Sequence, residues 1–260
     1  MTQLVTLFIS IMLFVVVAAV FYKLRKVHIA ALEIRELARS IRTEASALFA
    51  QERWQDLLNH QLNLQKPIPP TRGWAGSPDF LLQLAQHVAA GRPKVVLECS
   101  SGVSTLVIAR TMQQSGVGHV YSLEHDAAYA ERTRQMLRDY GVEDRATVLH
   151  APLIDRQGYS RWYDDSVLPS DLAPVELLVV DGPPMATSPL ARYPALSLLL
   201  HRLSDIATIF VDDADRDDER EMLRRWQREV QGLQVEFRYC EKGLAVASRT
   251  RPVGVFTASP

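Results

Sequence analysis

The sequence has only two cysteines among 260 residues, Cys99 and Cys240, and they lie far apart. Such a pair predicts no disulfide framework of the kind that holds small secreted domains together. Neither sign of charge dominates, because 29 Lys and Arg stand against 30 Asp and Glu, for a net charge of −1. The chain therefore offers no basic field for a nucleic acid. Internal repeats and low-complexity tracts are absent as well.

Charge is missing altogether from Leu4–Tyr22, an apolar stretch of 19 residues. As a helix with a rise of 1.5 Å per residue it spans about 28 Å, close to a bilayer core of about 30 Å. Lys23, Arg25 and Lys26 follow at once, whereas no Lys or Arg precedes the stretch. A cleaved signal peptide carries its positive charge before the apolar region, and positive flanks stay in the cytoplasm.

This order of charges predicts that residues 1–26 form an uncleaved, single-pass anchor with a basic flank. We expect the anchor to lie in the inner (cytoplasmic) membrane through residues 4–22, with the N-terminus outside and the remaining chain in the cytoplasm. The alternative is a secretory signal that is cut near Ala18-Ala19.

Glycine and proline are missing from His28–Leu64, a stretch rich in Ala, Leu, Glu, Arg and Gln, which predicts a helix. Apolar residues recur at spacings of three and four between Val27 and Leu48. Residues 27–48 are therefore a candidate coiled coil that pairs two copies, although such a helix can also lie on a membrane or dock onto the domain. Lys66–Pro70 ends the helix as a stiff linker. Residues 27–70 thus form a juxtamembrane segment, and 71–260 suffice for one domain with a substantial core.

The segment 94–105 carries the clearest functional signal. A short apolar run, Val95–Leu97, ends in Glu98; the small-residue turn Ser100-Ser101-Gly102 follows, and Ser104-Thr105 begins a helix. Small residues let the backbone approach a ligand, and the helix start offers unpaired N–H groups. The acid disfavours a pyrophosphate and favours a ligand with an amine or hydroxyls, such as S-adenosylmethionine. The plainer alternative is an ordinary joint of an α/β protein.

A second strand-like run ends in Glu124, 26 positions after Glu98, where nucleotide-binding βαβ units place the acid that binds ribose hydroxyls. Further runs end near His150, at Asp181 and at Asp212-Asp213. Their alternation with helical stretches predicts a doubly wound α/β fold, a mostly parallel sheet with helices on both faces. Ligands bind beyond the carboxyl ends of such strands, so these acids are expected to line one cleft.

The domain resembles the class I S-adenosylmethionine-dependent methyltransferases, and within them a bacterial O-methyltransferase-like group. The first motif of that group reads Leu-Glu-x-Gly-Ser-Gly-x-Ser-Thr, and this chain departs from it by carrying Ser100 in place of the first glycine. Further matching segments are Ser122–Asp126, Val180–Pro184, Ala191–Ala195 and Val211–Arg216.

The resemblance implies a Rossmann-like, seven-stranded sheet whose last strand is antiparallel, with Val235–Tyr239 and Leu244–Ala247 as its final hairpin. It also implies that Glu98 faces the methionine end of the cofactor, Glu124 binds the ribose and His150–Pro152 lies near the adenine. His125 is a candidate to flank the adenine or a solvated loop histidine. The residues expected at the cofactor are Glu98, Ser100, Gly102, Ser104, Thr105, Glu124, His125, Ala151 and Asp181.

Three aspartates indicate a metal as a further hypothesis. Asp181, Asp212 and Asp213 fall where catechol-type O-methyltransferases hold their ion, and oxygen ligands suit Mg²⁺. The chain departs from that pattern at Asp213, which replaces an amide, and at Pro184, which replaces a lysine base. In the alternative, Asp181 positions the substrate or the cofactor amine, and Asp213 or Asp215 caps a helix.

Together these observations predict a membrane-anchored S-adenosylmethionine-dependent methyltransferase acting on a small-molecule or lipid-linked acceptor. Asp181 and His150 are the candidate catalytic groups. The alternative is a catalytically inactive methyltransferase-fold module that serves as a membrane-tethered interaction protein. A nicotinamide-dependent oxidoreductase fits less well, because the Gly-x-Gly-x-x-Gly turn is absent.

Overall fold

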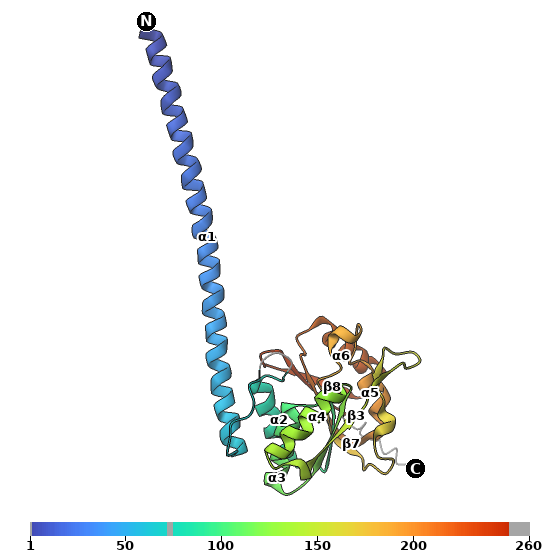
Figure 1. Ribbon diagram of the computed structural model, residues 1–260. Coiled ribbons are helices and arrows are strands. Elements are labelled where there is room, and N and C mark those ends of the chain that lie inside the picture. Colours follow the sequence, from blue (N-terminus) through green and yellow to red (C-terminus); the bar gives the residue numbers. More distant parts are fainter. Residues whose placement is uncertain (1, 72–74, 250–260) are drawn as a thin grey trace, which may run out of the picture. The chain divides into compact units, whose positions relative to one another are not determined.

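The computed structural model describes residues 2–71 and 75–249 (Figure 1). The chain divides into two compact units, one ending at Ala50 and the other beginning at Gln51. Helix α1, Thr2–Leu62, is continuous through the boundary and joins the predicted anchor and juxtamembrane helices into one. The physical reason is that no glycine or proline occurs before Pro67, so nothing in the sequence interrupts the backbone hydrogen bonds.

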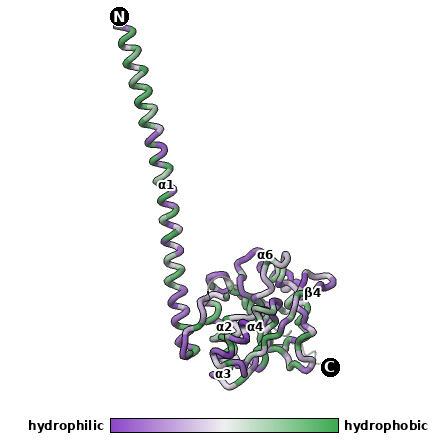
Figure 2. Tube along the Cα trace, in the orientation of Figure 1, coloured by the Kyte–Doolittle hydropathy of each residue, from purple (hydrophilic) through white to green (hydrophobic). Residues whose placement is uncertain are grey.

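The first unit is the part of α1 that ends at Ala50. Figure 2 shows hydrophobic residues nearly throughout its N-terminal part and a mixed pattern further along. The helix is long and apolar enough to cross a membrane, a property that membrane anchors share with signal sequences. Its large apolar side chains between Leu4 and Phe49 are exposed.

The second unit begins with the last turns of α1, which are part of the domain core. Leu58 and Leu62 are fully buried beside Ile68. The helix stops where Asn63 adopts a φ of 45°, and side chains of the domain bind its last carbonyls: Arg110 Nε donates to the oxygen of Leu62 at 2.8 Å. These contacts satisfy acceptors that a helix end leaves open.

Within the described residues, seven strands form one sheet in the order β3-β2-β1-β6-β7-β9-β8. The strands are β1 (Val95–Cys99), β2 (His119–Glu124), β3 (Ala146–His150), β6 (Val175–Val180), β7 (Leu203–Asp212), β8 (Leu233–Arg238) and β9 (Leu244–Arg249). Strand β9 is antiparallel to both neighbours, while the pairs from β3 to β7 are parallel. The predicted sheet and final hairpin are confirmed. A two-stranded ribbon, β4 (Leu153–Ile154) with β5 (Trp162–Tyr163), lies outside this sheet.

Two hydrophobic clusters, one on each face of the sheet, hold the domain together. Strand residues alternate between them: Val96 joins the first cluster, and Leu97 joins the second. The first cluster contains residues of α2 (Pro78–Gly91), α3 (Val103–Ser115) and α4 (Ala127–Asp139), and the second contains residues of α5 (Pro194–Leu199) and α6 (Asp217–Glu229). Short 3-10 helices complete the chain: η1 (Glu143–Arg145), η2 (Asp165–Val167), η3 (Met185–Thr187) and η4 (Leu200–Arg202).

The strand order reverses at β1, which pairs with β2 on one side and with β6 on the other. In open parallel sheets, connections leave in opposite directions at such a point, and the loops beyond the strands part to leave a crevice. The loops after β1, β2 and β6 therefore meet at one place.

Candidate active site

The turn after β1 has the backbone shape of a glycine-rich loop, although its first position is a serine. Ser100 adopts a φ of 139° and Gly102 a φ of 145°, both in the region that side chains disfavour. The amide of Ser100 donates to the carbonyl oxygen of Leu123 at 3.1 Å, which fixes the turn against β2. Replacement of the motif glycine thus leaves the loop shape intact at a cost of about 1–3 kcal/mol in backbone strain.

Ser100→Gly is expected to raise the free energy of unfolding by about 1 kcal/mol, because relief of the strain outweighs the greater freedom of glycine in the unfolded chain. Thermal unfolding of the two proteins measures the difference. Ser101→Gly is the matched control and should destabilise, because the Ser101 hydroxyl binds Glu124. A lower melting temperature for Ser100→Gly would show that the turn is not strained.

Glu98 lies beneath this turn and is fully buried. Its Oε2 accepts hydrogen bonds from the hydroxyls of Thr105 and Ser122, each at 2.6 Å, and Thr105 Oγ1 in turn accepts from the amide of Gly102 at 3.0 Å. Burial raises the pKa of Glu98, against the opposing hydrogen bonds of Ser104, Ser122 and Thr105. This network joins β1, β2 and α3 through one carboxyl group, so Glu98 holds the shape of the turn.

A cavity of about 340 Å³ opens at the carboxyl ends of β1, β2 and β6. Of the predicted cofactor residues, Ser100, Glu124, His125 and Asp181 line it. Glu98, Gly102, Ser104, Thr105 and Ala151 do not line it. Ala151 is buried, and its amide donates to the carbonyl of Glu124 at 2.7 Å.

Glu124 is the most enclosed carboxylate in the cavity wall, with 4% of its surface exposed. Its Oε2 accepts from Ser101 Oγ at 2.9 Å, and its Oε1 accepts from the amide of Asp126 at 3.1 Å. His125 Nδ1 lies 3.0 Å from the same Oε1, and this contact raises the pKa of His125. A carboxylate has about four acceptor positions, so Glu124 keeps capacity for the hydroxyls of a ligand.

Other lining residues were not predicted from the sequence. Tyr129 projects from the first turn of α4, whose start is capped by Asp126 Oδ1 accepting from the Tyr129 amide at 2.7 Å. Arg132 lies one turn further on, and Tyr163 comes from the short strand β5. A local signal for Tyr129 is its place three residues after Asp126. Trp162 and Tyr163 are buried in the second cluster, and Tyr163 also faces the cavity.

Gly182 leaves room for the Tyr163 hydroxyl. A Cβ atom at Gly182 would collide with that hydroxyl and lie 3.1 Å from the carbonyl oxygen of Cys99. Gly182→Ala is therefore expected to displace Tyr163 or the Ser100 turn and to weaken S-adenosylhomocysteine binding at least tenfold in calorimetric titration. Gly91→Ala, where the nearest atom is 4.0 Å away, is the control. Equal affinities for the two variants would show that this wall does not contribute to the cavity.

The predicted base His150 has no place in the cavity. It is exposed at the end of β3, and it is not among the residues that line the cavity. The register pairs His150 with Glu124 at the ends of two neighbouring strands. The lining of the cavity gives no support to His150 as a base, and this role stays a prediction.

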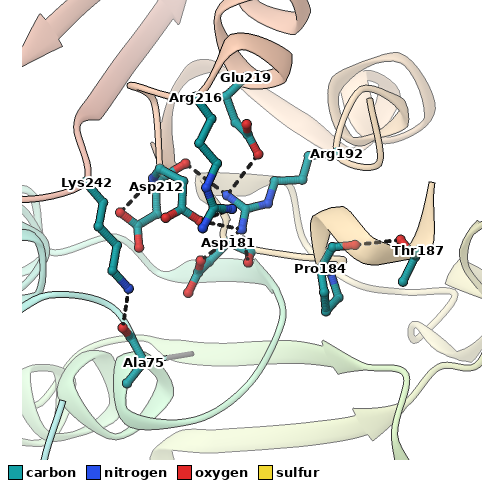
Figure 3. Close-up of polar contacts among 10 residues, drawn as sticks. Ala75, Asp181, Pro184, Thr187, Arg192, Asp212, Arg216, Glu219 and Lys242 are labelled. Carbon is teal, nitrogen blue, oxygen red and sulfur yellow. Dashed lines mark hydrogen bonds and ion pairs between the residues drawn. The ribbon is translucent and has the colours of Figure 1, made fainter. Parts of the chain in front are cut away.

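The three aspartates of the metal hypothesis converge, with ligand atoms within 4.8 Å of one another. Arg192, itself 5% exposed, supplies the positive charge among them (Figure 3). Its Nη2 lies 2.8 Å from Asp213 Oδ2 and 3.4 Å from Asp181 Oδ1, and its Nη1 donates to the carbonyl of Asp212 at 2.9 Å. Glu219 Oε1 lies 3.6 Å from Nη1. Arg192 thus contacts one carboxylate oxygen each of Asp213 and Asp181, whereas the carboxylate of Asp212 accepts from the amide of Asp213 at 2.8 Å. The magnesium site stays a prediction, with a guanidinium beside two of its three candidate ligands.

Asp181 stands between this cluster and the cavity, and its carboxyl is 11% exposed. Burial raises the pKa of Asp181 to about 7; Asp213 and Glu98 add to the rise, while Arg192 and Lys242 oppose it. A group with a pKa of about 7 at a cavity wall is suited to accept a proton near neutral pH.

The raised pKa of Asp181 predicts a pH dependence of stability. The folded chain holds this proton between pH 3.8 and about 7, where the unfolded chain has lost it. The contribution of Asp181 to the unfolding free energy therefore falls as the pH rises through this window, by at most about 1.4 kcal/mol per pH unit. Denaturation at pH 5 and pH 7.5 should show wild type losing stability relative to Asp181→Asn. A relative gain would contradict the assignment.

Comparisons with known proteins agree with this geometry. Residues 97–214 match the model of a family described as a methyltransferase domain. The S-adenosylhomocysteine-bound methyltransferase PaMTH1 of Podospora anserina is 16% identical, with a TM-score of 0.58 over 80% of this chain and 97% of that one. An O-methyltransferase from Bacillus cereus, in complex with S-adenosylhomocysteine, is 16% identical, with a TM-score of 0.53 over 77% of this chain and all (100%) of that one.

The O-methyltransferase TomG of Streptomyces achromogenes, in complex with S-adenosylmethionine, is 17% identical, with a TM-score of 0.50 over 77% of this chain and 99% of that one. Among curated proteins, none matches the sequence. Identities this low show only that the fold is shared. The family match covers the strands and loops that line the cavity. Residues 97–214, with the sheet to which they belong, therefore match a methyltransferase domain and share the fold of methyltransferases solved with S-adenosylmethionine or S-adenosylhomocysteine.

Proposed function

We propose that this chain is a membrane-anchored methyltransferase that moves a methyl group from S-adenosylmethionine to a small-molecule or lipid-linked acceptor. The observation that carries the proposal is the cavity at the reversal of strand order, with the enclosed carboxylate of Glu124 in its wall. The cavity also presents Ser100 Oγ, a buried hydroxyl that has no hydrogen-bond partner among the described residues. Both groups fit a ligand that carries ribose hydroxyls and an amine.

Five of the lining residues then have a role at the cofactor. Glu124 accepts hydrogen bonds from the ribose hydroxyls, and His125 and Tyr129 flank the adenine. Ser100 and Asp181 bind at the methionine end, where the Asp181 carboxylate attracts the positive charge of the cofactor. Glu98 does not contact the ligand and stabilises the turn through its hydrogen bonds with Thr105 and Ser122.

When bound, S-adenosylmethionine supplies a methyl group activated by its sulfonium. Transfer of that methyl group to a lone pair of the acceptor would break the carbon–sulfur bond and leave S-adenosylhomocysteine and the methylated acceptor. Asp181 lies at the cavity wall and takes the acceptor proton where the acceptor carries one. Positioning of the two ligands supplies much of the rate.

Calorimetric titration of the full chain in detergent tests the cofactor. We expect S-adenosylmethionine and S-adenosylhomocysteine to bind and NAD not to bind. Turnover of methyl-labelled cofactor with membrane and cytosol extracts then identifies the acceptor by its label. Binding of NAD, or of none of the three, would overturn the proposal.

The anchor is the second part of the proposal. Leu4–Tyr22 is uncharged and is followed by Lys23, Arg25 and Lys26, which favours an N-terminus outside and a catalytic domain in the cytoplasm. Protease added to spheroplasts should leave the domain intact and digest it only after the inner membrane is opened. Release of the protein by alkaline carbonate would contradict the anchor.

Pairing of two chains through residues 27–48 is part of the same proposal. Ile34, Leu37 and Ile41 are exposed on the helix, as a pairing surface requires. Cross-linking of Leu37→Cys in membranes should give a dimer, and the native cysteines do not interfere because both are buried. Glu36→Cys, at a charged position beside it, is the control and should cross-link less; equal yields would contradict a specific seam.

A further inference from the structure

We infer that a second cavity, on the far side of Asp181, binds the acceptor and selects one that carries a carboxylate or phosphate group; this inference rests on the proposed function. The second cavity has a volume of about 290 Å³. It shares Asp181 and Pro184 with the first cavity, so the two meet at one wall. A ligand in each cavity would bring its reacting end to Asp181.

The two acidic groups that line the second cavity are paired with arginines. Asp213 Oδ2 lies 2.8 Å from Arg192 and 2.8 Å from Arg216, and Asp181 is paired with Arg192. Because a guanidinium has five N–H donors and Arg216 binds one carboxylate oxygen, Arg216 keeps donors for a ligand.

Two basic side chains reach this wall from separate elements, as Figure 3 shows. Arg216 precedes α6, its side chain is 40% exposed, and among the described residues its guanidinium contacts Asp213 alone. A guanidinium has five N–H donors in a planar fork that matches carboxylates and phosphates. Lys242, from the loop between β8 and β9, donates to the carbonyl of Ala75 at 2.9 Å and adds a second positive charge.

The rest of the cavity is apolar and small. Pro184, Met185 and Ala186 form this part of the wall, and Met185 is 55% exposed. These residues fit the carbon skeleton of an acceptor, while Arg216 and Lys242 bind its anionic group at one side. The volume suits a single-ring acid or the phosphorylated end of a larger molecule.

Titration of the full chain saturated with S-adenosylhomocysteine tests the inference. The probes are 4-hydroxybenzoate, inorganic phosphate and the neutral 4-hydroxybenzamide. We expect the two anions to bind wild type and the amide not to bind. Arg216→Gln should weaken anion binding at least tenfold and leave S-adenosylhomocysteine affinity unchanged. Arg216→Lys should keep part of the affinity for the anions.

Arg220→Gln is the matched control, because Arg220 lies one turn along α6, pairs with Asp215 and lies outside the cavity. Equal binding of acid and amide, failure of both anions to bind, or equal losses in the two glutamine variants would overturn the inference. Failure of S-adenosylhomocysteine to bind would instead overturn the proposed function. The anion titrations would then be repeated on the protein without S-adenosylhomocysteine. A response to phosphate but not to 4-hydroxybenzoate would assign the site to phosphorylated acceptors.

Discussion

Glu124→Gln is expected to weaken S-adenosylmethionine binding by up to about 100-fold. The carboxylate is buried in the wall of the first cavity and is held by Ser101, by the amide of Asp126 and by His125. Hydrogen bonds to a charged group contribute about 1.5–3 kcal/mol each. Loss of such a bond to a ribose hydroxyl therefore removes up to about 3 kcal/mol, and each 1.4 kcal/mol is tenfold in affinity.

Glutamine keeps the shape of the side chain but replaces one acceptor oxygen with a donor, which must then face either the ribose or the Asp126 amide. The same titration with S-adenosylhomocysteine measures the loss without turnover. Glu131→Gln is the control, because Glu131 lies on the following helix α4 and its carboxylate is exposed beside Arg134 and Arg138. An unchanged affinity for Glu124→Gln, in a variant that melts like wild type, would remove the ribose assignment.

Arg192→Met is expected to lower the free energy of unfolding by about 3–5 kcal/mol, the cost of removing one partner from a buried ion pair. The guanidinium contacts Asp181, Asp213 and Glu219, and none of these carboxylates is more than 11% exposed. Methionine fills much of the space but leaves the charges without a partner in a medium of low dielectric constant. Burial already raises the pKa of Asp181 and Asp212, and loss of the guanidinium should raise both further.

Chemical denaturation of the full chain in detergent measures this loss. Arg138→Met is the control, because Arg138 forms an exposed pair with Glu131, and such pairs contribute less than about 1 kcal/mol. Arg192→Lys should lie between wild type and Arg192→Met, since it keeps the charge but loses the planar fork. Millimolar Mg²⁺ should stabilise Arg192→Met and leave wild type unchanged. A loss below about 1 kcal/mol would show that Arg192 does not neutralise the cluster.

Much of the fold follows from local pattern. The apolar runs at Val95–Cys99 and Val175–Val180 are short and rich in β-branched residues, and the turns that follow them are explicit in the sequence. The position of Glu124 follows in the same way, because a parallel sheet places the ends of its strands at one edge. The apolar length of α1 is likewise a property of the sequence alone.

The charge environment of the site was decided only by tertiary structure. The spacing of Asp181, Asp212 and Asp213 is compatible both with a metal and with an internal cation. The structure places Arg192 beside Asp181 and Asp213, because the chain before α5 packs against β6 and β7, as the bonds of Arg192 to the carbonyls of Asp181 and Asp212 show. Tyr163 enters the cavity wall from a ribbon with no periodic signal, and His150 turns out to be exposed. Sequence determines what is repeated or adjacent along the chain, whereas an ion pair or a cavity wall depends on distances between segments that only packing fixes.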